Sequence, residues 1–546
     1  MTPRKRSPSA GEGTSAARAE NAAAREGAFV SAGVSADLRD AVVEDDVPLP
    51  TAGGERDVEE DGADAFRAGR AGTAPVALRF VGRIGALTAA ERTALCERAT
   101  SNDVAVRERT QAIIARVRAE GDAALVAMAR EFDGAELTAL EVPRAEWRAA
   151  LEEVDAGLVR AMERTIANVR TVHTAFKPKA TEVEPEPGIV VGRRPDPLRR
   201  VGVYAPGGRA AYPSSVIMGV VPAKVAGVEE VVLCSPPGAD GFPSPVVLAA
   251  AALSGVDRVF ALGGAGAVAA MAYGTASVPR VDRIVGPGNA FVAEAKVQVS
   301  STCAIDSPAG PSELLVVADH TADPVAVARE MVAQAEHDPM AAVLCVALGE
   351  ETAEQVIEAL GALVPAAGRR DIVERALAAQ GGVLVAQTYD EAAAFATEWA
   401  AEHLQLAIGE PEQKMVLARL RNTGTVFLGE TSSVAYGDYM TGANHVLPTG
   451  GLARSYSGLS TLDFIRWTTY QRVSPQAAAK LAYDVGRFAD AEGLPGHAEA
   501  ARAWMKVRDG GRTRLKERAF RKKLRAIADA DDGAAGEPRG DDEPGA

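Results

Sequence analysis

The sequence has 546 residues, of which 47% are hydrophobic and 24% are charged, as is typical of a globular protein with sizeable apolar cores. This length exceeds what one hydrophobic core usually supports, so we expect two or more domains. The net charge of −15 disfavours non-specific attraction to nucleic acid or to anionic membrane surfaces.

The four cysteines lie far apart and include no Cys-x-x-Cys pair, which fits neither a disulfide framework nor a thiolate zinc site. A reducing cytoplasm is therefore the expected setting. The longest apolar stretch, residues 245–256, is much shorter than the ~20 residues of a membrane-spanning helix. The first residues also lack the apolar core of a secretory signal, so we expect neither export nor a membrane partner.

Both ends of the sequence differ in composition from its middle. Residues 1–76 are rich in Ala, Gly, Arg and acidic side chains with little apolar periodicity, which predicts a disordered extension. Residues 509–546 read as a basic and then acidic tail, also expected to be disordered. Its basic part, Arg512–Arg525, could bind a partner as an amphipathic helix, but a solvated tail is the simpler interpretation.

The first structured part of the chain has helical spacing. Up to about residue 180, apolar residues such as Ile113, Val117 and Leu125 share one side, and charged residues such as Arg116 share the other. We expect a small helical piece at 77–99 and few strands before residue 180.

After residue 190, short runs of β-branched residues alternate with Gly- or Pro-containing turns and with helical segments. Because parallel strands need helical crossovers, this repetition predicts parallel α/β layers. Two such series are present, so the fold class is α/β with two Rossmann-like domains. The expected strands are 200–204, 231–234, 259–262 and 284–285 in the first series, and 314–317, 343–346, 383–385 and 426–427 in the second.

Three glycine-rich turns follow strands of the first series, at 204–208, 263–266 and 286–289. Glycines after strands let backbone N–H groups approach a phosphate at a helix N-terminus, so these turns are candidates for nucleotide contact. The middle turn matches the dinucleotide fingerprint at Gly264 and Gly266, but no acidic residue ends the following strand. Tight turns that only join strand to helix are the alternative.

A helix expected to begin at Asp323 and Pro324 brings Gln334 and His337 together near its end. An amide oxygen and an imidazole nitrogen can both bind a metal, although a polar surface pair is the alternative. The expected buried face of this helix consists of Val325, Ala328, Val332 and Ala335.

The adjacent residues Glu402 and His403 lie where a helix leads toward an apolar strand, in a chain with only six histidines. An imidazole with a pKa near ~6.5 can accept an alcohol proton at neutral pH, and the carboxylate beside it can activate water. A capping or core histidine is the alternative.

Two further segments supply polar side chains. The Gly-rich loop at 437–449 carries Asp438, Asn444 and His445, and a loop of this length inside a compact domain is usually functional. A final acid and imidazole follow near the end of the chain, at Glu492 and His497.

Taken in order, these motifs resemble the histidinol dehydrogenase family from about residue 78 to about residue 507. The resemblance implies oxidation of L-histidinol to L-histidine through L-histidinal, with zinc and two NAD, in the last steps of histidine biosynthesis. The matching motifs are Val203-Tyr-Ala-Pro-Gly-Gly-Arg209, Gly286-Pro-Gly-Asn-Ala-Phe291, Asp306-Ser-Pro-Ala-Gly-Pro-Ser-Glu313, Gln334-Ala-Glu-His-Asp338, Glu402-His-Leu404 and Asn444-His-Val-Leu-Pro-Thr449.

The resemblance also implies roles for individual residues. Glu402 is expected to activate water and His403 to accept and donate protons. One zinc ion per subunit is expected to be bound by Gln334, His337, Asp438 and His497. The substrate is expected to contact these four residues together with Ser312, Glu402, His403 and Glu492.

NAD is expected to contact Tyr204, Asn289 and position 266. There this chain has Gly266 where the family commonly has glutamine. The loss of one hydrogen bond, on the scale of ~1–1.5 kcal/mol, is expected to weaken NAD binding by up to roughly tenfold.

In the family, a C-terminal piece reaches across a homodimer to complete the partner's site, so Glu492 and His497 are expected to act in trans. The expected domains are a disordered extension at 1–76, a helical piece at 77–99, a discontinuous α/β domain at 100–203 and 312–459, an NAD-contacting α/β domain at 204–311, the C-terminal piece at 460–508 and the tail at 509–546.

Several other functions fit parts of this pattern. The nearest is a dehydrogenase of the same family that acts on another small polar alcohol. A zinc hydrolase, with Glu402 activating water, and a non-catalytic metal-binding protein are the others. A thiohemiacetal at Cys234 or Cys303 is a further route to aldehyde oxidation, although packing is the expected role of Cys234 in its apolar strand.

Overall fold

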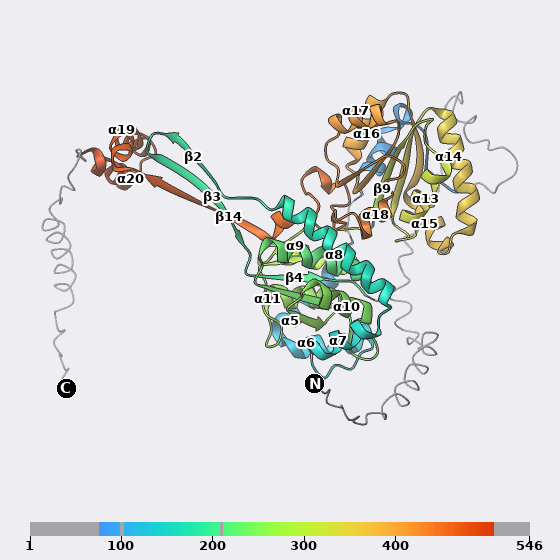
Figure 1. Cartoon of the computed structure of the whole chain (residues 1–546), viewed down its shortest axis with the longest axis horizontal. Coiled ribbons are helices and arrows are strands. Elements are labelled where there is room, and N and C mark those ends of the chain that lie inside the picture. The colour runs from blue at the N-terminus through green and yellow to red at the C-terminus, as the bar shows by residue number, and fades with distance from the viewer. Residues whose placement is uncertain (1–75, 99–102, 208–210, 507–546) are drawn as a thin grey trace, which may run out of the picture. The chain divides into compact units, whose positions relative to one another are not determined.

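The computed structural model describes residues 76–98, 103–207 and 211–506 (Figure 1). The extensions predicted at 1–76 and 509–546, including Arg512–Arg525, lie outside these residues, apart from Val76. The fold is mixed α/β with two parallel sheets, as the sequence predicts. None of the described helices is long and apolar enough to cross a membrane.

The larger sheet has six strands in the order β1-β11-β10-β9-β12-β13, and every neighbouring pair is parallel. Its central strands are continuous runs of buried Val, Leu and Ala, as expected for a sheet covered on both faces. All four strands predicted for this series are confirmed. The strands are β1 (Phe80–Arg83), β9 (Glu313–Ala318), β10 (Ala342–Leu348), β11 (Gly381–Ala386), β12 (His403–Ala407) and β13 (Thr425–Leu428).

Helices cover both faces of the six-stranded sheet (Figure 1). On one face lie α13 (Pro324–Ala335), α14 (Glu350–Leu363) and α15 (Arg370–Gln380), with α18 (Val434–Tyr439) beside them. On the other lie α4 (Ala89–Cys96), α16 (Tyr389–Trp399) and α17 (Glu410–Arg419).

Helix α13 begins as predicted, because the Asp323 side chain accepts a hydrogen bond from the Val325 N–H and Pro324 occupies the first turn. Its predicted buried face is confirmed at Ala328 and Ala335 and wrong at Val325, which is exposed. Met331 and Gln334 are buried in addition, because the side of the helix that they share with Ala328 and Ala335 meets the sheet.

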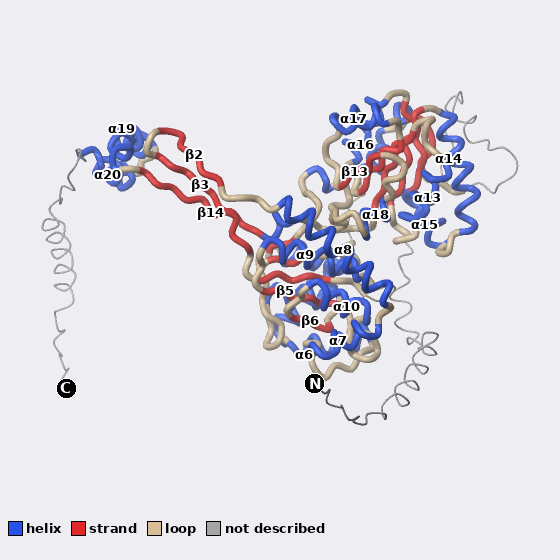
Figure 2. Tube along the Cα trace, viewed as in Figure 1, coloured by secondary structure: helices blue, strands red, loops and turns tan. Residues whose placement is uncertain are grey.

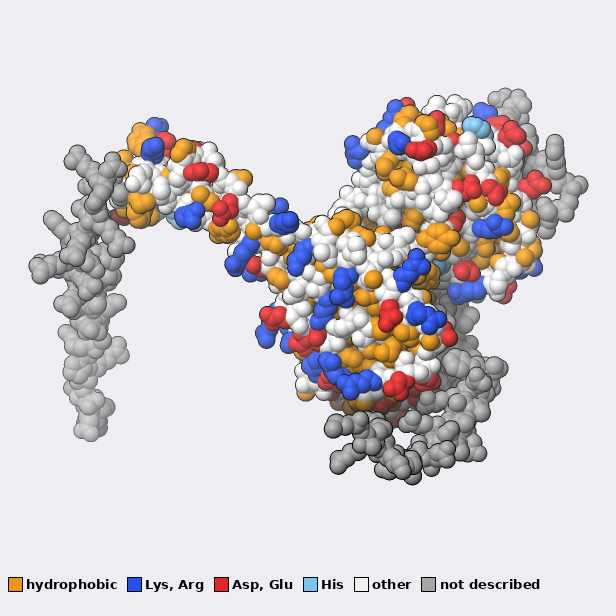
Figure 3. Space-filling model, in the orientation of Figure 1, with side chains coloured by type: hydrophobic (Ala, Val, Ile, Leu, Met, Phe, Trp, Pro, Cys, Tyr) orange, Lys and Arg blue, Asp and Glu red, His pale blue; other side chains and the backbone are white. Residues whose placement is uncertain are grey.

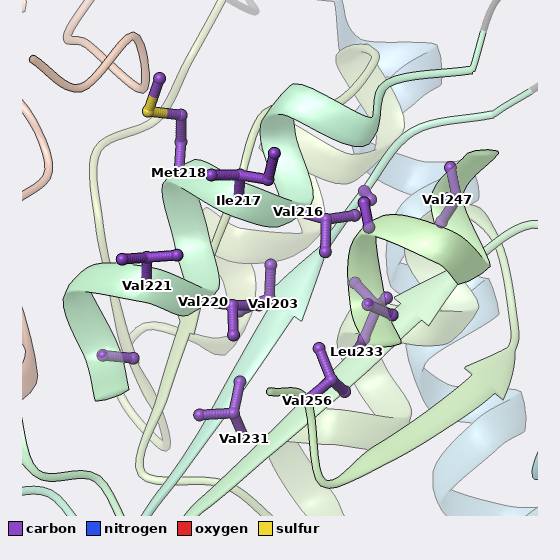
Figure 4. Close-up of a cluster of buried hydrophobic side chains, with 14 of the residues drawn as sticks. Val203, Val216, Ile217, Met218, Val220, Val221, Val231, Leu233, Val247 and Val256 are labelled. Carbon is purple, nitrogen blue, oxygen red and sulfur yellow. The ribbon is translucent and has the colours of Figure 1, made fainter. Parts of the chain in front are cut away.

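The smaller parallel sheet has five strands in the order β6-β5-β4-β7-β8. All four strands predicted for this series are confirmed. Figure 4 shows part of its core, where Val203 of β4 and Leu233 of β5 pack with Val216 and Val220 of α9. The strands are β4 (Arg200–Tyr204), β5 (Glu230–Ser235), β6 (Arg258–Ala261), β7 (Arg283–Val285) and β8 (Ala304–Ile305). The helices after these strands are α9 (Pro213–Ala226), α10 (Pro245–Ser254), α11 (Gly264–Tyr273) and α12 (Ala290–Val299).

Four helices that precede β4 in the chain lie beside the helices of the five-stranded sheet. Helix α5 contacts α11 and α12, α7 contacts α10, and α8 contacts α9. This differs from the expected grouping of residues 100–203 with 312–459. The reason is that α9–α11 are apolar on nearly all sides, so they require a second helical layer over them. These helices are α5 (Val104–Glu120), α6 (Asp122–Met128), α7 (Arg144–Glu153) and α8 (Ala156–Phe176).

The segment expected as a small helical piece at 77–99 contains α4 but begins with a strand. Strand β1 pairs with β11, so this segment completes the edge of the six-stranded sheet. The strand is only four residues long, too short to show a period-two pattern in the sequence.

A third, antiparallel sheet has the order β14-β3-β2 (Figure 2). This sheet was not predicted, because every residue of β2 is exposed and the charged residues of β2 give no apolar pattern. The turn between β2 and β3 meets the start of α19, where the Ser474 N–H donates to the Gly188 carbonyl. The elements are β2 (Thr181–Glu186), β3 (Ile189–Pro197), β14 (Ile465–Val473), α19 (Pro475–Ala491) and α20 (Pro495–Arg502).

Candidate active site

Glu402 and His403 are buried at the amino end of β12, beside the amino end of β9. Helix α16 ends at Trp399, and the left-handed backbone of Ala400 (φ 56°) turns the chain toward β12. The Glu313 N–H donates to the Glu402 carboxylate at 2.7 Å, and the His403 Nδ1–H donates to the Glu313 carbonyl at 3.0 Å. Nδ1 therefore carries a proton, and Nε2 is the ring nitrogen that Glu313 leaves free to accept a proton.

Nε2 of His403 lies 3.6 Å from Oδ1 of Asp438 and has no hydrogen-bond partner within the described part of the chain. Burial lowers the pKa of His403, but Glu402 and Asp438 outweigh it and raise the pKa to about 10. A cation held by Asp438 would reverse part of this rise. Burial also raises the pKa of the Glu402 carboxyl above its ordinary value, which makes it a stronger base when ionised.

Three of the four predicted metal ligands lie on or beside α13 and α18, two helices on the same face of the six-stranded sheet. Gln334 is buried in the last turn of α13, His337 follows the helix, and Asp438 lies in α18. Burial lowers the pKa of His337, and Asp438 interacts with it electrostatically in the opposite direction. Burial would raise the pKa of Asp438, but His403 and the other nearby imidazoles hold it below its ordinary value. A neutral imidazole and an ionised carboxylate are the forms that bind metals.

The polar loop predicted at 437–449 in fact begins inside helix α18, which ends at Tyr439. We call residues 438–446, which are the last two residues of α18 and the loop that follows, the Asp438 loop. Within it, the Nδ1–H of His445 donates to the Asp438 carbonyl at 2.9 Å, and burial lowers the pKa of His445. No role was predicted for His445. The sequence feature that could have indicated its place in the site is its position next to Asn444 in one of the matching motifs.

Two helices that pack with the five-stranded sheet, α8 and α9, hold the Asp438 loop. From α8, Thr165 donates to the Tyr439 carbonyl and Asn168 to the Met440 carbonyl, both at 2.7 Å. From α9, the Met218 carbonyl accepts a bond of 2.8 Å from the buried side chain of Asn444. These bonds restrict the backbone on either side of the Asp438 carboxylate.

The fourth predicted ligand, His497, lies on α20, and Glu492 lies at the end of α19; both side chains are exposed. Among the described residues, neither side chain forms a hydrogen bond or an ion pair with another predicted site residue. Ser312 is half-buried directly before β9, where its carbonyl accepts from the Ala342 N–H. Across the described ranges, no group of three or more His, Cys, Asp or Glu side chains is arranged to hold a metal ion. The assignment of these residues to a metal site therefore stays a prediction.

The predicted cofactor residues flank the point where the order of the five-stranded sheet reverses. Strands β4, β5 and β6 follow one another in one direction, and β7 returns to the other side of β4. Ligands of open α/β sheets bind at the carboxyl ends of strands at such a point. Tyr204 ends β4, and Asn289 caps α12 beyond β7 by accepting from the Val292 N–H. The two residues are thus placed as nucleotide-contacting residues of this fold would be.

A tight turn after β7 adjoins Tyr204. Gly286 has φ 116°, and a Cβ atom there would collide with the Tyr204 carbonyl, so only glycine fits. The buried Lys296 ammonium donates to the Gly286 carbonyl at 3.1 Å and pairs with Asp306, whose carboxylate accepts from the Gly286 N–H at 2.8 Å. Both the N–H and the C=O of Gly286 are therefore hydrogen-bonded, which fixes the turn.

Gly266 is buried within α11, and a Cβ atom there would lie 3.1 Å from Sδ of Met128. This glycine allows α6 to pack closely on α11. The hydroxyl of Tyr204, by contrast, accepts a bond of 3.1 Å from the Gly264 N–H, and burial raises its pKa to about 12.

The cysteines considered for a thiol route are buried. Burial raises the pKa of the Cys234 thiol well above its usual range and that of Cys303 to about 11. A thiolate is the reactive form, so neither side chain has the environment of a nucleophile. The four cysteines of the chain are free thiols.

Comparison with known proteins agrees with the motifs. A family model described as histidinol dehydrogenase matches residues 96–505. A histidinol dehydrogenase of Natronomonas pharaonis is 48% identical over 421 residues, which cover 77% of this chain and 98% of that protein. One of Methanosarcina mazei is 44% identical, with 73% and 92% covered. A crystal structure of histidinol dehydrogenase from Elizabethkingia anophelis matches with a TM-score of 0.75 at 32% identity, covering 79% of this chain and 99% of that one.

Proposed function

The chain belongs to the histidinol dehydrogenase family, and from this premise we propose that it oxidises L-histidinol to L-histidine through L-histidinal, using zinc and two NAD. The observation that carries the proposal is the buried arrangement of Glu402 and His403 around the backbone of Glu313, with Asp438 facing His403. It supports the proposal because the imidazole of His403 and the carboxylates of Glu402 and Asp438 lie side by side.

His403 is the proposed proton acceptor in both oxidations. Its Nδ1–H stays bonded to the Glu313 carbonyl, so Nε2 takes the hydroxyl proton of the alcohol. Nε2 returns this proton to the aldehyde oxygen as water adds, and it then takes the hydroxyl proton of the hydrated aldehyde. Tyr204 and Asn289 would contact NAD, which would supply the hydride acceptor for each oxidation.

Glu402 is the proposed base for the step between the oxidations. One of its oxygens is already bonded to the Glu313 N–H, which fixes the carboxylate in place. The other oxygen takes a proton from water as that water adds to the aldehyde carbon. Burial favours this step because it raises the pKa of Glu402 and so strengthens the base.

Gln334, His337 and Asp438 are the proposed ligands that this chain supplies to zinc. Nitrogen and oxygen donors without thiolate suit zinc, and burial keeps His337 in the neutral form that a ligand needs. These three residues would hold the ion, which would supply a positive charge that orients the substrate's nitrogen atoms and with them its reacting carbon.

A second copy of the chain is the proposed source of His497 and Glu492. Hydrophobic side chains lie exposed on and near α19 and α20, among them Phe488, which is 74% exposed, and Trp504, which is 51% exposed (Figure 3). Such residues on a helix pair usually mark an interface. We propose a homodimer in which these helices complete the partner's site. We also propose a cytoplasmic location, which the free thiols support.

The test of the proposal is the yield of NADH from L-histidinol by the purified, zinc-loaded protein. Two NADH per histidinol are expected. We expect His403→Asn to lose kcat while zinc content stays the same, and His337→Asn to lose zinc. Absence of NADH from the wild type would overturn the assignment, and one NADH per substrate would reduce it to a simple alcohol dehydrogenase.

The shared site is tested by mixing two inactive variants, His403→Asn and His497→Asn, under conditions that exchange subunits. If His497 acts in trans, each heterodimer regains one intact site, and activity should reach about a quarter of the wild-type value. No recovery at all, with exchange demonstrated, would contradict the shared site.

A further inference from the structure

We propose that the buried ion pair between Arg98 and Glu313 is a positioning device that aligns both Glu402 and His403. Arg98 follows helix α4, and Glu313 is the first residue of β9. The inference rests on the proposed function, because Glu402 and His403 are catalytic only within it. It adds two residues that have no role in the mechanism above except through the Glu313 backbone.

The backbone of Glu313 is the common support of the two catalytic side chains. In a β-strand the N–H and the C=O of one residue point to the same side. For Glu313 that side faces β12, where the N–H meets the Glu402 carboxylate at 2.7 Å and the C=O meets Nδ1 of His403 at 3.0 Å. A shift or rotation of this one residue therefore displaces both groups together.

The side chain of Glu313 is held at several points. Nε and Nη2 of Arg98 donate to its two carboxylate oxygens at 2.8 and 3.1 Å, and the Gly450 N–H donates at 2.8 Å. Only 6% of the Arg98 side chain and 3% of the Glu313 side chain are exposed. A bidentate fork of this kind fixes the orientation of the carboxylate plane as well as its distance.

Arg98 also reaches the other strand of the site. Its Nη2 donates to the Trp399 carbonyl at 2.8 Å, and its guanidinium lies 3.8 Å from the centre of the Trp399 ring. Trp399 ends α16, three residues before Glu402. One guanidinium thus joins the start of β9 to the segment that leads into β12.

Stability alone is a weak explanation for this pair. Removing two charges from water costs free energy that their attraction only partly offsets, and apolar residues of similar volume often serve as well or better. The geometry that the pair imposes on Glu313 is what an apolar replacement would not reproduce. A displacement of ~1 Å at reacting groups can cost about 10²-fold in rate.

The test compares Arg98→Met with Arg92→Met in the zinc-loaded enzyme. Arg92 lies in α4 and also forms a bidentate ion pair, with Glu398 of α16, but this pair is about 40% exposed and no bond from Arg92 to Glu313 is present among the described residues. We expect Arg98→Met to lower kcat by about 10²-fold with zinc content and the KM for histidinol little changed, and Arg92→Met to keep kcat within about twofold of wild type. Equal kcat values for the two variants would overturn the proposal.

A double variant, Arg98→Met with Glu313→Met, separates positioning from stability. It leaves no unpaired buried charge, so we expect its thermal stability to recover toward that of the wild type while kcat stays low. Recovery of kcat together with stability would show that the pair acts only on folding, and would overturn the proposal.

A spectroscopic readout keeps the inference separate from the proposed function. With ¹⁵N-labelled histidine, the hydrogen-bonded Nδ1 proton of His403 should be observed in the wild type and in Arg92→Met and be lost in Arg98→Met. This measurement needs no turnover. A wild type that forms no NADH would overturn the proposed function, whereas a Nδ1 resonance unchanged in Arg98→Met would overturn the positioning role.

Discussion

His173 in α8 makes the stability of the fold depend on pH below neutrality. Its ring is 2% exposed, and neither ring nitrogen has a hydrogen-bond partner among the residues that the structure describes. Burial lowers its pKa from 6.5 to about 4. The difference of about 2.5 units corresponds to about 3 kcal/mol of stability when the titration is complete.

The sign follows from which state binds the proton more readily. Below pH 6.5 the unfolded chain protonates His173, while the folded chain resists protonation until the pH approaches 4. The full stability is therefore present above pH 6.5 and is lost as the pH falls toward 4. At pH 5 the loss amounts to about 2 kcal/mol.

The perturbation is His173→Leu, which removes the titrating group and keeps an apolar side chain at the position. Hydrogen exchange of the α8 amides at pH 7.5 and pH 5, corrected for intrinsic rates, gives the opening free energy of this helix without assuming that the whole chain unfolds together. Between the two pH values, the wild type should lose about 2 kcal/mol more than the variant.

His320→Gln is the matched control, because His320 is exposed and its replacement should leave the pH dependence unchanged. If wild type and His173→Leu lose the same free energy between pH 7.5 and pH 5, the ring is not held neutral by burial. The reasoning from burial would then be refuted, whatever the absolute stabilities are.

Two further predictions concern the active site. Asn168→Ala removes one hydrogen bond to the Asp438 loop and should weaken zinc binding about fivefold in a chelator competition, the scale of a ~1 kcal/mol hydrogen bond. Thr171→Ala loses only a hydrogen bond within α8 and should keep the zinc affinity of the wild type. Equal zinc affinities of the two variants would refute this anchoring. Cys234→Ser and Cys303→Ser should keep most turnover because burial raises the pKa of both thiols, and loss of the aldehyde step alone in either would revive the thiol route.

Local patterns in the sequence predicted most of the two parallel sheets. Runs of Val, Leu and Ala between glycine-rich turns indicated eight strands, since a strand covered on both faces must be apolar along its length, whereas the short strands β1 and β8 were not predicted. The start of α13 was equally readable, because an Asp-Pro pair determines a helix N-terminus by local bonding. The motif order also identified the family.

Segments whose structure depends on distant partners were missed or misplaced. Strands β2, β3 and β14 lack an apolar period, and they form a sheet only because Ile465–Val473 returns beside Ile189–Pro197. The buried face of α13 depended on which side of the helix meets the sheet, so Val325 was assigned to the wrong side.

The sequence by itself determined the chemical groups available: an amide, imidazoles and carboxylates in recognisable motifs. Tertiary structure alone decided that Glu313, remote from Glu402 and His403 in the chain, holds both through its own N–H and C=O, and that Arg98 in turn holds Glu313. It also placed His497, the fourth predicted metal ligand, on α20 with its side chain exposed. The physical reason is that hydrogen bonds and ion pairs act only over a few ångströms, and distances of this kind between remote residues are set by packing and not by local sequence.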